Sequence, residues 1–229
     1  MPRFFVTSSQ IKNGAVTITG DDAHHLSRSL RAAVGDVITV CDMARREYEC
    51  ELTAFLPDSV EARIVSERAA DTEPPVRITL YQALPKGDKL DTVIQKAVEC
   101  GVSCIQPFES ERCVVRAKAD AEERKTERRQ RIATEAAKQC GRGILPEVLP
   151  TVSYEQMLAQ AAKSDLPLFC YEGEGTRPIG RLLSERAPQA GGEIALIIGS
   201  EGGFSLKEAE QALASGFCLT GLALTQVPF

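Results

Sequence analysis

A group of glycines near the end of the chain is the strongest chemical signal in the sequence. The apolar run Ile194–Ile198 leads directly into Gly199–Gly203, and Ser205 follows with Glu208 three residues later, which is the spacing of a helix capping box. Glycine permits positive φ angles and lets a flat ligand approach the backbone closely. A junction of strand, glycine turn and helix therefore predicts a small-molecule site. The alternative is a tight loop that only begins a helix, and the motifs of nucleotide hydrolysis and dinucleotide binding are missing.

A second candidate site is the segment Pro85-Lys86-Gly87-Asp88-Lys89, where an expected strand ends and a helix begins. Backbone N–H groups at a helix start favour anions, and Lys86 and Lys89 add positive charge. The segment predicts a contact with RNA phosphate. An ordinary corner with two solvated lysines is the alternative.

A third group lies at the end of a basic segment. Residues 112–142 carry ten Lys and Arg side chains against five Asp and Glu, a net charge of +5 in a chain whose net charge is −5. This local basic face, with Arg112 at its start, is typical of a nucleic-acid surface, although a salt-bridged solvated helix has the same composition.

Four polar residues within that segment share a helical spacing. Glu135, Lys138, Gln139 and Arg142 stand at i, i+3, i+4 and i+7, so they are expected on one helix face. Gln139 could read a base edge while Arg142 binds phosphate. An exposed polar face without function is the alternative.

Arg3, Arg28 and Arg31 give the N-terminal part of the chain a basic edge, which predicts RNA docking. The two histidines, His24 and His25, have no identifiable catalytic partner. The eight cysteines contain no Cys-x-x-Cys pair, so neither a metal site nor a disulfide framework is expected. No apolar run reaches the roughly 18 residues of a membrane helix, and the N-terminal apolar stretch is too short for a secretory signal, which favours a cytoplasmic protein.

The elements that would position these residues fall into two regions. Residues 1–70 are expected to form short strands around one helix, as in a small β-barrel domain, and the Pro-containing stretch 71–75 is expected to be a linker. Residues 76–229 alternate strands with helices, which predicts an α/β domain with a mostly parallel sheet. The helices are expected at residues 88–100, 120–140, 154–162, 177–185 and 206–214, and the strands at 76–84, 102–108, 166–171, 193–198 and 217–224.

The sequence resembles the ribosomal RNA small subunit methyltransferase E family of the SPOUT superfamily. The resemblance covers roughly residues 2–217, and the matching stretches are Arg3-Phe4-Phe5, His25 to Asp36, Pro85 to Lys89, Val93 to Val102, Ser110-Glu111-Arg112, Arg131 to Arg142 and Ile198 to Ser205. It implies an N-terminal PUA-like RNA-binding barrel, a C-terminal trefoil-knot domain and a homodimer. It also implies methylation of N3 of a uridine in 16S rRNA of the small ribosomal subunit, with S-adenosylmethionine as the cofactor.

The resemblance further implies the roles of individual residues. The expected cofactor-binding residues are Ile198, Gly199, Glu201, Gly202, Gly203, Phe204 and Leu222. The expected RNA-binding residues are Arg3, Arg28, Arg31, Lys86, Lys89, Arg112, Lys138 and Gln139. The positive charge of Arg142 would favour the uridine anion, and Glu135 would take the N3 proton, for which water is the alternative base.

The chain departs from the family pattern in two places. Ser200 replaces the proline of the usual Gly-Pro-Glu-Gly-Gly turn, a change that a turn should tolerate. The last ten residues, Thr220 to Phe229, lack the family's Arg…Glu-Thr-Ala turn and its closing helix, so we expect a truncated methyltransferase domain, as from a frameshift or early stop, with weak cofactor binding or none. A non-catalytic RNA-binding protein is therefore an alternative function. A metabolic enzyme with another nucleotide at the glycine turn fits the basic segment poorly.

Overall fold

The computed structural model describes residues 1–117 and 119–221, which form two compact units. The N-terminal unit contains residues 1–73 together with 134–145. The C-terminal unit contains residues 74–133 and the chain from residue 146 onward. The segment 134–145 was expected in the second domain, and the structure groups it with the first. Leu222, one of the expected cofactor residues, and the divergent residues 222–229 lie outside the described residues.

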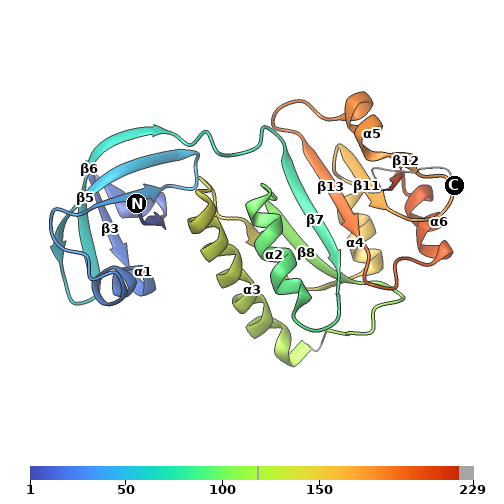
Figure 1. Cartoon of the computed structure of the whole chain (residues 1–229), viewed down its shortest axis with the longest axis horizontal. Coiled ribbons are helices and arrows are strands. Elements are labelled where there is room, and N and C mark those ends of the chain that lie inside the picture. The colour runs from blue at the N-terminus through green and yellow to red at the C-terminus, as the bar shows by residue number, and fades with distance from the viewer. Residues whose placement is uncertain (118, 222–229) are drawn as a thin grey trace, which may run out of the picture. The chain divides into compact units, whose positions relative to one another are not determined.

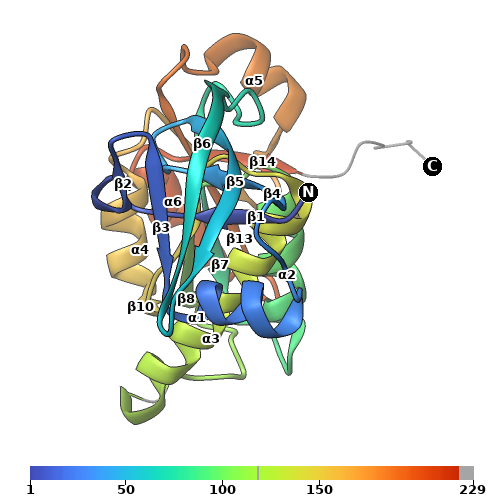
Figure 2. The same ribbon diagram turned by 90° about the vertical axis from the view of Figure 1, so that its left-hand side faces the viewer.

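The N-terminal unit is built on a six-stranded mixed sheet. Its strands are β1 (Arg3–Phe5), β2 (Ile11–Lys12), β3 (Ala15–Thr19), β4 (Val37–Cys41), β5 (Arg46–Phe55) and β6 (Ser59–Ala69). Their order is β1-β4-β5-β6-β3-β2, in which only β1 and β4 pair in parallel. Figure 2 shows the long strands β5 and β6 side by side. A 3-10 turn (Ser8–Gln10), the short helix α1 (Gly20–His24) and a π-helical turn (His25–Ser29) complete this part of the unit.

Alternating side chains form the core of this sheet. In β3, Val16 and Ile18 are buried while their neighbours face outward, and they pair with Ala62 and Val60 of β6. Successive residues of a strand point to opposite faces, so this alternation gives one apolar face. Phe4 and Leu26 add to the same buried cluster.

The C-terminal unit is an α/β structure in which every strand pair is parallel. Its strands are β7 (Arg77–Ala83), β8 (Cys104–Glu109), β9 (Glu147–Val148), β10 (Val152–Ser153), β11 (Leu166–Cys170), β12 (Arg177–Pro178), β13 (Glu193–Ile198) and β14 (Cys218–Gly221). Its helices are α2 (Lys89–Glu99), α4 (Tyr154–Ala161), α5 (Ile179–Arg186) and α6 (Leu206–Ala214). Helix α3 (Ala119–Cys140) begins in this unit and ends in the N-terminal one. The predicted fold class, a small β domain followed by a parallel α/β domain, is confirmed.

The strand order places β13 at the centre of the parallel sheet. The order is β10-β8-β7-β13-β11-β14-β12, so β13 pairs with β7 on one side and β11 on the other. Figures 1 and 2 show α2 and α6 on opposite sides of β7 and β13. In parallel sheets the carboxyl ends of the strands meet at one edge, where ligands bind. The turns that follow β7, β11 and β13 therefore converge.

Helix α2 illustrates how the sequence pattern determines an element. Leu90, Ile94 and Val98 recur at helical spacing and are buried. The helix ends at Glu99, and Gly101 follows with φ +96°, as expected of a glycine that terminates a helix.

Candidate functional site

The glycine turn connects β13 to α6 through the predicted capping box. The Oγ of Ser205 accepts from the backbone N–H of Glu208 at 3.3 Å, and the Glu208 carboxylate accepts from the backbone N–H of Ser205 at 2.8 Å. These two bonds satisfy N–H groups that a helix start leaves unpaired. They fix the point at which the turn ends and the helix begins.

A cavity of about 700 Å³ opens beside this turn. Six of the seven residues expected to bind a cofactor line it: Ile198, Gly199, Glu201, Gly202, Gly203 and Phe204. The other lining residues are Arg112, Cys170, Tyr171, Glu172, Gly173, Thr176, Ser200, Leu206 and Gly221. The cavity lies at the carboxyl edge of the sheet, and its volume is in the range of small-molecule sites.

Two of the glycines are tightly packed against other parts of the protein. A Cβ added to Gly199 would lie 3.2 Å from Phe204, and one added to Gly202 would lie 3.2 Å from the Cβ of Arg112. Gly203 has open space around it but φ +62°, a conformation that side-chain-bearing residues rarely adopt. The sequence-based interpretation gave positive φ and close approach of a ligand as the reasons for these glycines; Gly203 shows the positive φ, Gly199 and Gly202 make tight internal contacts, and the approach of a ligand stays a prediction.

Aromatic side chains pack together at the end of the glycine turn. Phe204 is buried, with its ring centroid 4.2 Å from Phe169 and 6.2 Å from Phe108. Burial raises the pKa of the adjacent Cys170 thiol to about 12. A thiol with a raised pKa is mostly protonated at neutral pH and is a poor nucleophile.

The segment Ser110-Glu111-Arg112 is fixed against the start of α6. The Glu111 backbone N–H donates to Glu208 at 2.8 Å, and the Ser205 hydroxyl donates to the Glu111 carboxylate at 2.8 Å. Tyr154 donates to the backbone oxygen of Glu208 at 2.6 Å, and burial raises the pKa of its phenol. These bonds place Arg112 at the cavity wall, where its guanidinium donates to the Gly202 oxygen at 3.0 Å.

The two lysines expected to contact RNA differ in their surroundings. Both are exposed, but the Lys89 ammonium lies 2.7 Å from the Glu201 carboxylate, while Lys86 offers only its backbone N–H to that carboxylate, at 3.2 Å. The Lys89 hydrogen bond is the main cause that lowers the pKa of Glu201 to about 2. Glu201 is therefore ionised at neutral pH and holds the glycine turn against the segment before α2.

Glu135, Lys138, Gln139 and Arg142 were expected on one helix face. For Arg142 this prediction is wrong. Helix α3 ends at Cys140, and Gly141 has φ +79°, so the chain leaves the helix before Arg142. Glu135 and Gln139 are exposed on the helix.

Lys138 has partners inside the N-terminal unit. Its ammonium lies 2.8 Å from Asp22 and 3.5 Å from Glu135, and 5.6 Å from the centroid of the Phe4 ring. Its role in RNA binding stays a prediction.

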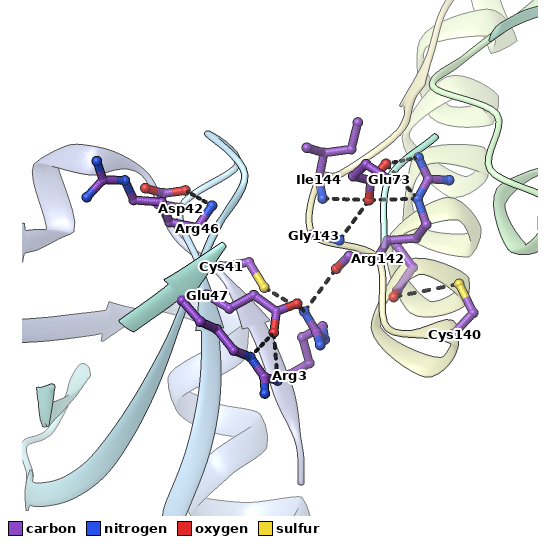
Figure 3. A network of polar contacts seen from close by, with 12 residues as sticks. Arg3, Cys41, Asp42, Arg46, Glu47, Glu73, Cys140, Arg142, Gly143 and Ile144 are labelled. Atoms are coloured by element: carbon purple, nitrogen blue, oxygen red, sulfur yellow. Dashed lines mark hydrogen bonds and ion pairs between the residues drawn. The ribbon is translucent and has the colours of Figure 1, made fainter. Parts of the chain in front are cut away.

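Arg142 is buried in an ion pair with Glu73 (Figure 3). Their side chains are 4% and 2% exposed, and the Arg142 guanidinium donates to both carboxylate oxygens at 2.7 to 3.1 Å. The backbone N–H groups of Gly143 and Ile144 donate to the same carboxylate at 2.8 and 3.2 Å. Burial acts to raise the pKa of Glu73, but these hydrogen bonds outweigh it and the pKa lies below its usual range. The structure thus gives Arg142 a structural role, and its catalytic role stays a prediction.

Arg3 is likewise engaged within the N-terminal unit (Figure 3). Its guanidinium donates to Glu47 at 2.6 Å, to the Cys41 sulfur at 2.8 Å and to the backbone oxygen of Arg142 at 3.2 Å. Arg28 and Arg31 are exposed, and neither has an ion pair within residues 1–117 and 119–221. Both side chains are therefore accessible to solvent, and their role in RNA binding stays a prediction.

Sequence reasoning missed the cavity residues Tyr171, Glu172 and Gly173 and the buried Gln82 behind the turn. Their position in the sequence could have indicated the first three, because Tyr171 to Gly173 follow the carboxyl end of a predicted strand of a parallel sheet, where ligands bind. Within the described part of the chain, no helix has the length and apolar character needed to cross a bilayer. Among those same residues, no three His, Cys, Asp or Glu side chains gather as metal ligands would.

Comparison with known proteins agrees with this architecture. The family described as RNA methyltransferase domain matches residues 72–225, and the one described as RNA methyltransferase PUA domain matches residues 18–65. Ribosomal RNA small subunit methyltransferase E of Bacillus subtilis is 31% identical over 217 residues, which are 92% of this chain and 84% of that protein. The protein of the same name from Synechocystis is 32% identical over 216 residues, which are 94% of this chain and 69% of that protein.

A solved structure has the same fold over nearly the whole chain. The crystal structure of ribosomal RNA small subunit methyltransferase E from Neisseria gonorrhoeae, bound to S-adenosyl methionine, is 30% identical, with a TM-score of 0.81 and coverage of 98% of this chain and 90% of that one. Together, the two matching domains, the curated relatives and this structure show that the chain belongs to the ribosomal RNA small subunit methyltransferase E family.

Proposed function

We propose that this chain binds S-adenosylmethionine in the cavity beside the glycine turn and methylates N3 of a uridine in 16S rRNA. The observation that carries the proposal is the convergence of Ile198 and Gly199–Phe204 on one cavity of about 700 Å³ at the carboxyl edge of the sheet. The Neisseria relative, whose structure covers 98% of this chain, is bound to S-adenosyl methionine.

The residues present fit such a cofactor. Phe204 and Ile198 supply apolar surface, and the glycine turn presents backbone amide and carbonyl groups that can bond a nucleoside. Bound there, S-adenosylmethionine would supply an electrophilic methyl group. Glu172 and Arg112 add one negative and one positive side chain to the lining, which suits a ligand that carries both charges.

The protein's part in the reaction is to position the base and to favour loss of its N3 proton. Uridine N3 is protonated at neutral pH, and the C–N bond forms as the bond from carbon to the sulfonium breaks, so the proton must leave N3. Positive charge near the base favours the anion. We propose Arg142 and Glu135 for these roles as the resemblance implies; the charge of Arg142 is balanced by Glu73 in the N-terminal unit, and Glu135 is an exposed carboxylate.

The RNA contacts proposed for this reaction are the exposed Arg28, Arg31, Lys86 and Gln139, together with Arg3, Lys89, Arg112 and Lys138. We also propose that residues 1–70 form the RNA-binding domain, that the chain acts as a homodimer and that it works in the cytoplasm, where ribosomal RNA is its substrate. Light scattering of the purified chain tests the dimer.

Methyl transfer is the direct test. Tritiated S-adenosylmethionine is incubated with the chain and small ribosomal subunits that lack the modification, and the RNA is digested and analysed by mass spectrometry for 3-methyluridine. Label in that nucleoside supports the proposal. RNA retention in a filter-binding assay without transfer would support the non-catalytic RNA-binding alternative instead.

A further inference from the structure

The glycine turn is held in place by side chains from three other segments of the C-terminal unit. The first is Gln82, at the end of β7, which is 5% exposed. Its amide nitrogen donates to the backbone oxygen of Gly199 at 3.1 Å and to that of Ala83 at 3.0 Å. Both amide hydrogens are therefore bonded to carbonyl oxygens, and one of these oxygens belongs to Gly199, the first residue of the glycine turn.

The second contact holds the middle of the turn. The Glu201 carboxylate accepts from the backbone N–H of Lys86 at 3.2 and 3.3 Å and from the Lys89 ammonium at 2.7 Å. These donors belong to the segment that begins α2. Glu201 thereby fastens the turn to the neighbouring strand–helix junction.

The third contact holds the end of the turn. Arg112 donates to the Gly202 oxygen at 3.0 Å, and its Cβ would lie 3.2 Å from a Cβ added to Gly202, a tight contact. Within the turn itself, one backbone bond closes the loop, from Gly203 N–H to the Ser200 oxygen at 2.9 Å.

A turn with three glycines needs such supports if it is to form a fixed wall. Glycine loses more backbone freedom on ordering than any other residue. A ligand that had to order the turn would lose that free energy from its binding, whereas a turn ordered beforehand avoids the cost.

We propose that Gln82, the Lys89–Glu201 pair and Arg112 are positioning residues that hold the glycine turn in its ligand-binding form. The inference rests on the proposed function for the identity of the ligand, S-adenosylmethionine. Glu201 holds the backbone of its own turn, and Lys89 and Arg112 act on the cavity wall as well as on any RNA.

The chain provides a matched control for two of the three contacts, those of Gln82 and Lys89. Gln106 is 2% exposed on the adjacent strand β8 and donates to two other carbonyls, of Pro107 at 3.1 Å and Pro150 at 2.5 Å. Lys96 lies on the same helix as Lys89, its side chain is 62% exposed against 63%, and it pairs with Glu99 at 2.8 Å. Gln106→Leu and Lys96→Met therefore remove similar bonds away from the turn.

Two measurements on the full chain test the proposal. Hydrogen–deuterium exchange of the peptide that spans residues 199–204, without ligand, is expected to quicken about tenfold in Gln82→Leu and Lys89→Met and to stay unchanged in Gln106→Leu and Lys96→Met. Calorimetry with S-adenosylmethionine is expected to show affinity about tenfold weaker in the first pair alone, and Lys89→Arg is expected to restore it.

The outcomes separate the positioning role from the proposed function. Equal exchange in Gln82→Leu and Gln106→Leu, together with equal exchange in Lys89→Met and Lys96→Met, would overturn the positioning role. A wild-type chain that binds no S-adenosylmethionine but shows the expected exchange pattern supports the positioning role and counts against the proposed function. Lys89→Met replaces an exposed side chain, so the test stands even if Gln82→Leu fails to fold.

Discussion

Replacing Arg142 with methionine removes one half of an ion pair that the N-terminal unit keeps almost wholly from solvent. The Glu73 carboxylate, 2% exposed, would lose the guanidinium and keep only the backbone N–H groups of Gly143 and Ile144. Breaking a buried pair by removing one partner costs about 3–5 kcal/mol. Because two backbone donors to Glu73 remain, we expect a loss of unfolding free energy at the lower end of that range, about 3 kcal/mol. This loss is a large fraction of the roughly 5–15 kcal/mol by which a folded domain is stable.

The cost of Arg142→Met should depend on pH in a definite direction. In the wild type the pKa of Glu73 lies below its ordinary 4.5, so the charged carboxylate contributes stability that is present above pH 4.5 and is lost as the pH falls through the folded-state pKa. In the variant, burial would act without the guanidinium and raise that pKa. The carboxylate then destabilises the folded state at neutral pH and is neutralised in acid. The difference in unfolding free energy should therefore be largest at pH 7 and shrink toward pH 4.

Urea unfolding followed by far-UV circular dichroism is the assay, since the chain contains no tryptophan. Arg68→Met is the matched control, because Arg68 is 74% exposed and pairs with Glu47 at 2.9 Å in the same unit, so its loss should cost less than about 1 kcal/mol. If Arg142→Met costs no more than Arg68→Met, or costs the same at pH 7 and pH 4, the reasoning about this buried pair is refuted.

Three further predictions follow from single contacts. Ser205→Ala removes the N-cap of α6 and should cost about 1 kcal/mol in thermal unfolding; an unchanged midpoint would contradict the capping geometry. Cys170, with its pKa raised to about 12, should resist iodoacetamide at pH 8 while the exposed Cys140 reacts, as peptide mass spectrometry would show; equal labelling would count against its burial. Arg31→Gln should weaken binding to a 16S rRNA fragment and reduce the salt slope by about 0.7, and an unaltered slope would remove Arg31 from the RNA surface.

The order of strands and helices could be predicted from the sequence because its signals are local. Apolar periodicity located α2, and Ser205 with Glu208 marked the start of α6 within the capping box observed. The two-residue strands β2, β9, β10 and β12 escaped prediction, because a segment of two residues has no periodicity to detect.

The contacts between residues that are far apart in the sequence could not be predicted. A charged residue is usually exposed, so nothing near Arg142 predicted a buried partner in Glu73. Gln82 carried no signal either, since its role depends on the Gly199 carbonyl, 117 residues away. The six predicted cofactor-binding residues that line the cavity were located through a recognised motif at a strand end, where parallel topology brings loops together.

The discontinuous N-terminal unit has a consequence for the order in which the chain folds during synthesis. Arg3 meets the backbone of Arg142 across 139 residues, and Glu73 receives its ion-pair partner and two amide donors only from residues 142–144. A nascent chain that has emerged only to residue 73 therefore carries a Glu73 carboxylate whose guanidinium partner and amide donors have not yet been translated. The N-terminal unit can therefore finish folding only after residue 145 has been translated, and a fragment cut at residue 73 should be a poor substitute for that unit.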